Sequence, residues 1–347
     1  GGNNLCWFYA RDKSAQMVNE CEYLATIDHI SMNSTKAAVQ YQGSVQLHDI
    51  EGDPDGRNTK QFPDTQDDSA VSSSHLTEQF FIYATTMGSI VYYSLEDGTR
   101  PNEYRHVDGI KTIFPSPTGM RLVVVDNNTT GYIYNPVDST LLEIKNFPHD
   151  TTSLLWDRDR KDPNVFVVVG KSEATTFRYR PIGLRGQTVV ALGNTKVPSS
   201  FSPIVLYGSQ ITYQPMNGTL QTVTLSSHSA LAKIPEPGST DQLKFQQAVD
   251  IGRFDEAFEI AVEVEELGLW STLRMAALEA LDVQTAIKVG KQTRAAATVL
   301  ALQRATTCRI LRIPNCPFSV KTCWFTTSSG RDRVCVSRYL RVLRCCR

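Results

Sequence analysis

Gly170-Lys171-Ser172 follows an apolar run, and the same tripeptide ends the phosphate-binding loop of many nucleotide-binding proteins. Such a loop also needs a glycine five residues upstream, so that its backbone N–H groups can wrap around a phosphate. That position is Val165, inside the stretch VFVVVG, which favours a buried strand. We therefore interpret the tripeptide as a turn and assign no phosphate site to it.

Six histidines could carry protons or bind metals, but they are scattered singly and lack the spacing of metal-ligand motifs. They are His29, His48, His75, His106, His149 and His228. Asp126, Asp157 and Asp159 are interpreted as turn and strand-end residues. No GxGxxG or GxSxG stretch occurs. The sequence therefore predicts no catalytic, cofactor-binding or metal-binding residue.

Most of the cysteines crowd into residues 303–347, a tail with ten basic and one acidic side chains. They are Cys308, Cys316, Cys323, Cys335, Cys345 and Cys346. Without a CxxC pair or a histidine, the tail does not favour zinc. Trp324, Phe325 and Tyr339 among basic residues could contact nucleic acid. However, the composition resembles nothing upstream and the helical periodicity stops at Gln303. We interpret the tail as a non-native reading of the gene, such as a shifted frame or a retained intron, with no function and no nucleic-acid partner.

The elements that would position any site are mostly short strands, and one small-residue turn recurs among them. Its anchors are Gly43, Gly88, Gly131, Ala174 and Gly218, which stand 45, 43, 43 and 44 residues apart. This step is typical of a four-stranded WD40-like propeller blade. Residues 1–232 are therefore predicted to form an incomplete WD40-like β-propeller of about five degenerate blades, truncated at the N-terminus. A sandwich of two Greek-key sheets is the alternative, but it would not need equal steps.

Helical periodicity replaces the strand pattern after a Pro- and Gly-containing linker at residues 233–241. Phe254, Ala257, Phe258 and Ala261 share one helical face. A similar pair of helices follows after about 30 residues, as in tetratricopeptide repeats. Residues 242–302 are thus predicted to begin a tetratricopeptide-like α-solenoid, with a small helical cap as the alternative. No apolar run approaches the ~18 residues of a membrane span, so direct membrane insertion is not expected.

Four stretches carry a family resemblance: CWFYA at 6–10, YRHVDGIKTIFPSPTGMRLVVVD at 104–126, NTKVPSSFSPIVLYGSQITYQPMNGTL at 194–220 and RFDEAFEIA at 253–261. In order and spacing they resemble the WD repeat-containing protein 19 family. The resemblance implies most of a second propeller and the first helices of a long solenoid. It also implies a non-enzymatic subunit of intraflagellar transport complex A that uses no cofactor, with the other subunits and transport cargo as partners. After Gln303 the sequence departs from the family, which would continue its helices there. This departure puts the partner-binding part of the solenoid in doubt.

Propeller faces and solenoids offer wide surfaces for other proteins, so a scaffold is the favoured function. The resemblance places it in retrograde transport, cilium assembly and membrane-cargo entry, at the cilium or flagellum, the basal body and in the cytoplasm. The body of the chain is poor in cysteine and does not need disulfides, which is compatible with a reducing compartment. A vesicle-coat subunit with the same plan is one rival. A propeller hydrolase or lyase is another, but it would need reactive side chains to converge on the central channel.

Overall fold

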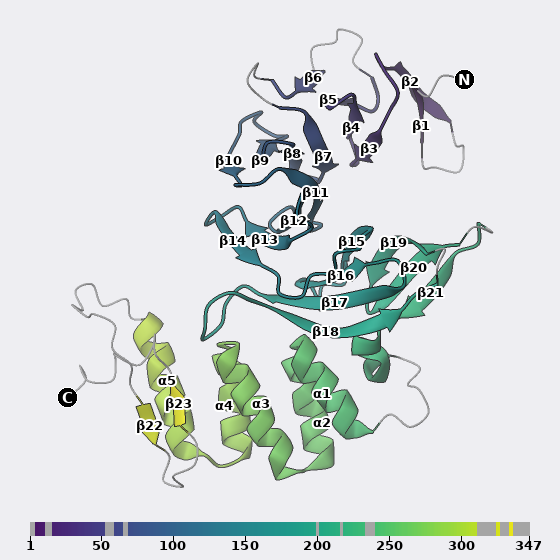
Figure 1. The fold of residues 1–347 in the computed structure, drawn as a ribbon. Coiled ribbons are helices and arrows are strands. Elements are labelled where there is room, and N and C mark those ends of the chain that lie inside the picture. The colour runs from purple at the N-terminus through teal and green to yellow at the C-terminus, as the bar shows by residue number, and fades with distance from the viewer. Residues whose placement is uncertain are drawn as a thin grey trace. The chain divides into compact units, whose positions relative to one another are not determined.

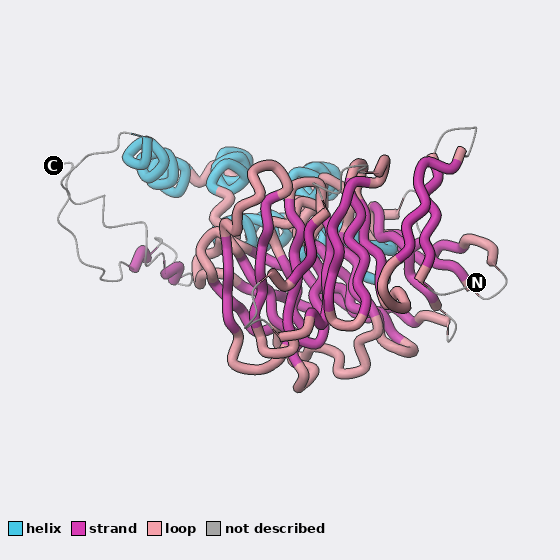
Figure 2. Tube along the Cα trace, turned by 90° about the horizontal axis from the view of Figure 1, so that it is seen from above, coloured by secondary structure: helices cyan, strands magenta, loops and turns pink. Residues whose placement is uncertain are grey.

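The computed structural model describes residues 4–10, 16–52, 59–64, 69–198, 201–215, 218–232, 240–310, 324–326 and 333–335. The chain divides into two compact units, residues 1–156 and 157–347. Strands fill the first unit and begin the second, and helices follow from residue 241 (Figures 1 and 2). Each unit is described by itself below.

The first unit consists of antiparallel sheets whose strands follow one another in chain order. A two-stranded sheet contains β1 (Leu5–Tyr9) and β2 (Met17–Glu22). The next sheet contains β3 (His29–Met32), β4 (Lys36–Tyr41), β5 (Ser44–Asp49) and β6 (Lys60–Phe62). The third contains β7 (Val71–Leu76), β8 (Phe80–Thr85), β9 (Ser89–Ser94) and β10 (Asn102–Arg105). The last complete sheet contains β11 (Ile110–Pro115), β12 (Leu122–Asp126), β13 (Gly131–Asn135) and β14 (Thr140–Glu143), and β15 (Ser153–Trp156) ends the unit.

The sheet β7–β10 buries both of its faces, which is why its strands read as continuous apolar runs. Because side chains alternate along a strand, Phe81 and Tyr83 face one way and Ile82 and Ala84 face the other. The first pair packs in a core shared with the sheet β3–β6, and the second pair in a core shared with the sheet β11–β14. All four side chains are fully buried. Side chains on both faces of these strands are therefore apolar, because each face packs against a neighbouring blade.

The recurring turn lies where the sequence predicts it, at or beside the connection between the second and third strands of each blade. Gly43 joins β4 to β5, and Gly88 joins β8 to β9. At Gly88 the backbone φ is +94°, and a Cβ would come within 2.6 Å of the carbonyl oxygen of His106. Glycine is needed there both for the left-handed backbone and for the close approach.

In the second unit, two more groups of strands precede the helices. The first contains β16 (Val165–Val169), β17 (Glu173–Arg180) and β18 (Thr188–Lys196). The second is a three-stranded sheet of β19 (Ser202–Tyr207), β20 (Gln210–Gln214) and β21 (Gln221–Thr224). A 3-10 helix, η1 (Ser226–Leu231), leads out of the strands. Along the chain, five blades therefore follow one another, at β3–β6, β7–β10, β11–β14, β15–β18 and β19–β21.

Helices make up the rest of this unit: α1 (Asp241–Ile251), α2 (Phe254–Val264), α3 (Leu267–Glu279), α4 (Val283–Gln292) and α5 (Ala296–Ile310). Thr240 caps α1 by accepting a hydrogen bond from Leu243 N, and Asp282 caps α4 in the same way through Thr285 N. Phe258 packs edge-on against Trp270 at 5.2 Å between ring centres. Phe254, Ala257 and Ala261 are buried in the same core, which confirms the apolar face expected of α2.

Helix α5 continues to Ile310, beyond the point at Gln303 where we expected the helical pattern to stop. Residues 304–310 contain neither Gly nor Pro, so nothing in them breaks a helix, and the first proline after them is Pro314. Of the remaining tail, the described strands β22 (Trp324–Thr326) and β23 (Arg333–Cys335) pair antiparallel. Most of the linker and most of the tail lie outside the described residues.

The structure confirms the predicted fold class, a five-bladed β-propeller followed by paired helices. The sandwich alternative is not supported, because the strands of every blade lie in chain order, whereas a Greek-key sheet would place a strand beside a non-consecutive one. Within the described residues, none of the helices combines the length and the apolar character that crossing a bilayer requires.

Candidate functional site at the blade–helix joint

The second unit contains a buried ionic cluster between its strands and its first helical hairpin. Asp162 precedes β16, and Arg253 lies in the turn between α1 and α2. Nε of Arg253 donates to Oδ1 of Asp162 at 3.0 Å, and Nη2 donates to Oδ2 at 2.5 Å. The carboxylate side chain is 1% exposed and the guanidinium 13%. This two-pronged contact fixes both the position and the orientation of the hairpin.

His228 of η1 adds a third member to the cluster. Its Nε2 lies 3.4 Å from Oδ2 of Asp162, and its ring is fully buried. Its Nδ1 lies 2.9 Å from Oγ of Ser227. Burial alone would raise the pKa of Asp162, but His228 and Arg253 outweigh it and hold that pKa at about 2. The carboxylate therefore stays ionised throughout the physiological range.

Arg178 of β17 makes a second contact with the hairpin. Its Nη1 donates to the carbonyl oxygen of Asp250 at 2.9 Å, in the last turn of α1. A cation at this place satisfies a free carbonyl and complements the helix dipole. Gly252 ends α1 with a φ of +91°, and a Cβ there would overlap the Arg178 guanidinium. Burial lowers the pKa of Arg178 to about 10, so the group remains charged.

We call the group Asp162, Arg178, His228 and Arg253 the blade–helix joint. Hydrogen bonds between neutral groups support it. Gln247 of α1 accepts from Ala230 N at 2.9 Å and donates to Ser226 O at 3.0 Å. These bonds hold η1 against α1. The strands of the last blades and the first helical hairpin are thereby connected by charged and neutral contacts at once.

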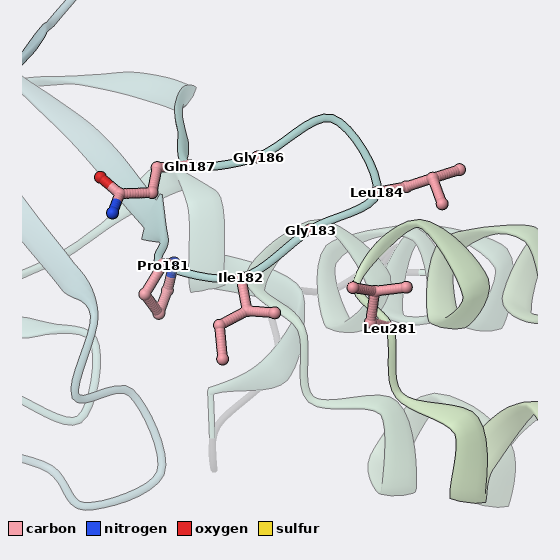
Figure 3. Close-up of a pocket in the computed structure, with 7 residues that line it drawn as sticks. All are labelled: Pro181, Ile182, Gly183, Leu184, Gly186, Gln187 and Leu281. Atoms are coloured by element: carbon pink, nitrogen blue, oxygen red, sulfur yellow. The ribbon is translucent and has the colours of Figure 1, made fainter. Parts of the chain in front are cut away.

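A groove in the second unit is formed by the loop between β17 and β18 and the turn after α3. Its volume is about 240 Å³, and its lining is mostly aliphatic: Pro181, Ile182, Gly183, Leu184, Gly186, Gln187 and Leu281 (Figure 3). Leu184 N donates to the carbonyl oxygen of Glu279 at 2.9 Å, which ties the loop to α3. The lining has one polar side chain, Gln187, so the groove offers little to orient a small substrate.

The structure brings some of the histidines close to aspartates that are far from them in sequence. His106 Nε2 lies 3.9 Å from Asp126 Oδ2, and together with Asp108 these residues form a group whose potential ligand atoms lie within 4.8 Å of one another. Asp126 also accepts from Thr130 N at 2.8 Å, as expected of a turn residue. The sequence expectation of no metal site remains a prediction.

The turn interpretation of Asp157 and Asp159 is confirmed by their bonds. Oδ1 of Asp157 accepts from Asp159 N at 2.9 Å and from Gly208 N at 3.0 Å. Asp159 Oδ1 accepts from Lys161 N at 3.0 Å. Lys171 and Ser172 are exposed at the turn between β16 and β17, as a turn interpretation requires.

The remaining histidines each pack against a different neighbour. The rings of His29 and His75 pack edge to face, with their centres 5.5 Å apart. His48 Nε2 lies 2.7 Å from the Tyr23 hydroxyl, and His149 Nδ1 lies 3.0 Å from Oγ1 of Thr129.

Sequence reasoning missed the blade–helix joint because its members are far apart in the chain and of ordinary types. Asp162, His228 and Arg253 are separated by 66 and 25 residues, and no motif links them. One signal was available: Arg253 follows Gly252 directly before an apolar helix, where a charge is commonly a solvated helix-end residue. Nothing in the sequence indicated that its partner would be buried.

Comparison with known proteins identifies the family. The model of the WDR19 second β-propeller matches residues 1–228. WD repeat-containing protein 19 of Mus musculus is 32% identical over 310 residues, which cover 88% of this chain and 23% of the relative. The Homo sapiens protein of that name is 32% identical over 311 residues, with the same coverage. The Caenorhabditis elegans protein dyf-2 is 29% identical over 294 residues, or 84% of this chain and 21% of the relative.

The chain thus spans less than a quarter of the length of these relatives. Among solved structures, the crystal structure of Kluyvelomyces marxianus Hsv2 is similar, with a TM-score of 0.50 and 14% identity over 63% of this chain and 73% of that one. At this identity the likeness concerns the fold alone. The family model covers all five blades up to η1, and the identity to the mouse and human proteins extends over most of the chain. The chain therefore belongs to the WD repeat-containing protein 19 family.

Proposed function

We propose that this chain is part of a non-enzymatic scaffold subunit of intraflagellar transport complex A. It would act in retrograde transport along the cilium or flagellum, in cilium assembly and in the entry of membrane cargo. Its partners would be the other subunits of the complex and transport cargo. Its locations would be the cilium or flagellum, the basal body and the cytoplasm.

The blade–helix joint is the observation that supports this proposal best. A scaffold must hold its binding surfaces at fixed positions, and Asp162–Arg253 fixes the first helical hairpin on the strands of its unit. The buried, paired charges of the joint are occupied by each other, which suits a structural role better than proton transfer or ligand binding. A propeller and a solenoid together present large surfaces without a reactive centre.

The test uses the full-length protein, tagged, in ciliated cells that lack their own copy. Arg253→Met removes the guanidinium from the joint, and Lys161→Ala is the matched control. Lys161 pairs with Glu256 at 3.2 Å, but its side chain is 65% exposed. We expect the wild type and the control to co-purify with the other complex A subunits and to restore retrograde transport. The Arg253→Met protein should lose both.

Recovery of the wild type with vesicle-coat subunits and without complex A subunits would contradict the proposal. So would normal transport by Arg253→Met once hydrogen exchange had shown that its hairpin is loosened, because the joint would then be irrelevant to the function.

A further inference from the structure

Two cysteines face each other across the first sheet of the molecule. β1 and β2 are antiparallel, and their register places Cys6 directly opposite Cys21. Tyr23 N donates to the carbonyl oxygen of Asn4 at 2.9 Å, which makes Asn4 and Tyr23 a hydrogen-bonded pair. Because such pairs alternate with non-hydrogen-bonded ones, Cys6 and Cys21, two positions further along, are hydrogen-bonded as well. Their Cα atoms are then about 5.5 Å apart, within the range of about 4.4 to 6.8 Å found in disulfides.

Both thiols lie on the inner face of this sheet, beside the core formed by Phe8, Tyr23 and Tyr41. Each is half-buried and free. The Asn19 amide donates to Sγ of Cys21 at 3.3 Å and keeps that side chain in place. The register therefore makes each thiol the cross-strand neighbour of the other.

We propose that Cys6 and Cys21 are a redox-modification site, which forms a reversible cross-strand disulfide with a small oxidised thiol, such as glutathione disulfide, as the oxidant. One cysteine thiolate attacks glutathione disulfide and releases one glutathione. The second thiolate then attacks the protein sulfur of the mixed disulfide and releases another. The protein loses two electrons and two protons, and one glutathione disulfide becomes two glutathione molecules.

Geometry and environment make this bond labile rather than permanent. In a hydrogen-bonded pair the Cβ atoms are about 5.5 Å apart, whereas a disulfide needs about 3.5 to 4.5 Å. The sheet must close by roughly 1 Å, and a disulfide under such strain is easily reduced. Burial raises the pKa of both thiols, and the neighbouring Cys21 raises the pKa of Cys6 further, so oxidation is slow at neutral pH and faster in alkali. The bond would tie the sheet β1–β2 under oxidising conditions and release it under reducing ones.

The test is disulfide mapping of the whole chain after incubation with an excess of glutathione disulfide, alkylation and tryptic digestion without reductant. The expected product is peptide Gly1–Arg11 linked to peptide Ser14–Lys36, which distinguishes this bond from any bond to the tail cysteines. Excess reduced glutathione should return both thiols to the alkylatable form. In Cys21→Ser the linked product should be lost completely, and Cys6 should carry glutathione instead. Cys345→Ser, which removes a thiol elsewhere, should leave the linked product unchanged.

Three results would overturn the proposal. They are recovery of both peptides only as separate glutathione adducts, linkage of either one to a tail cysteine, and persistence of both thiols in the alkylatable form after prolonged incubation at alkaline pH. Because the measurement is made on the unsubstituted chain, it does not depend on whether the serine variants fold.

Discussion

The interfaces between blades in the first unit and the joint between strands and helices in the second use opposite chemistry. Between blades, apolar side chains of alternating parity fill the gap, and neutral hydrogen bonds such as that from Leu76 N to Ser31 Oγ at 2.8 Å set the alignment. At the joint, Asp162 and Arg253 are both charged and nearly inaccessible to water. Burying ions is expensive unless they are paired, so the joint depends on each partner individually, whereas a blade interface depends on many small contributions.

This difference shows which contacts determine how one element pairs with a particular neighbour. A repeat can reuse one alternating apolar pattern at each interface between blades. The place where the repeat ends needs contacts that occur once. Asp162 meets Arg253, and Arg178 meets the end of α1. Blades of the first unit also carry charged contacts, but these differ: Arg100 pairs with Asp64 at positions 26% and 48% exposed, and His106 lies 3.9 Å from Asp126.

Arg253→Met should have the largest effect, because it leaves the Asp162 carboxylate buried without its main partner. We expect a loss of about 3 to 5 kcal/mol in the free energy of opening of α1 and α2. Native-state hydrogen exchange measures this opening helix by helix. The exposed Lys161→Ala control should change it by less than about 0.5 kcal/mol. Removing both charges with Asp162→Leu and Arg253→Met together should restore much of the loss; no restoration would mean that the pairing is not the cause.

Gly252→Ala should come next, since it affects two features of the joint at once. The backbone there is left-handed, which costs a residue with a Cβ about 1 to 2 kcal/mol. The new Cβ would also displace Arg178 from Asp250, which adds about 1 kcal/mol. Gly186→Ala is the matched control, since its φ is +92° but nothing lies within 4 Å of its Cβ position. Urea unfolding of both variants measures the difference, and equal losses would show that Arg178 does not stabilise the joint.

Acid should weaken the joint selectively. The folded pKa of Asp162 is about 2, below its usual value of about 4, so the unfolded state binds the proton more readily. The stabilisation is complete above pH ~4 and is lost as the pH falls towards ~2, a change of about 2 kcal/mol. Unfolding of the wild type and of Asp162→Asn across this range gives the contribution as a difference. The same pH dependence in both proteins would contradict this assignment.

These contrasts also explain what could be predicted from the sequence. Blades were predictable because the turn anchors from Gly43 to Gly218 repeat at nearly constant steps and each strand carries its own pattern of burial. Helices α1 to α4 were predictable from Thr240, Gly252 and the apolar stripes. The joint was not, because a buried ion pair between Asp162 and Arg253 is a property of two distant positions and leaves no local pattern. The predicted end of the last helix, at Gln303, was wrong for a related reason. Loss of amphipathic periodicity does not by itself stop a helix when no Gly or Pro follows.

The smallest effect should come from Ser31→Ala, which tests the other side of the comparison. Its hydroxyl accepts from Leu76 N at 2.8 Å, between β3 and β7 of neighbouring blades. The alanine would leave that N–H without this acceptor, at a cost of about 1 to 2 kcal/mol. Ser34→Ala is the control, since its hydroxyl donates to Glu78 at an exposed site. Because both Ser31 and Leu76 N are neutral, the Ser31→Ala loss should be the same at pH ~4 and pH ~7, measured by hydrogen exchange in β7. A loss that depended on pH would mean that charge also contributes to this blade interface.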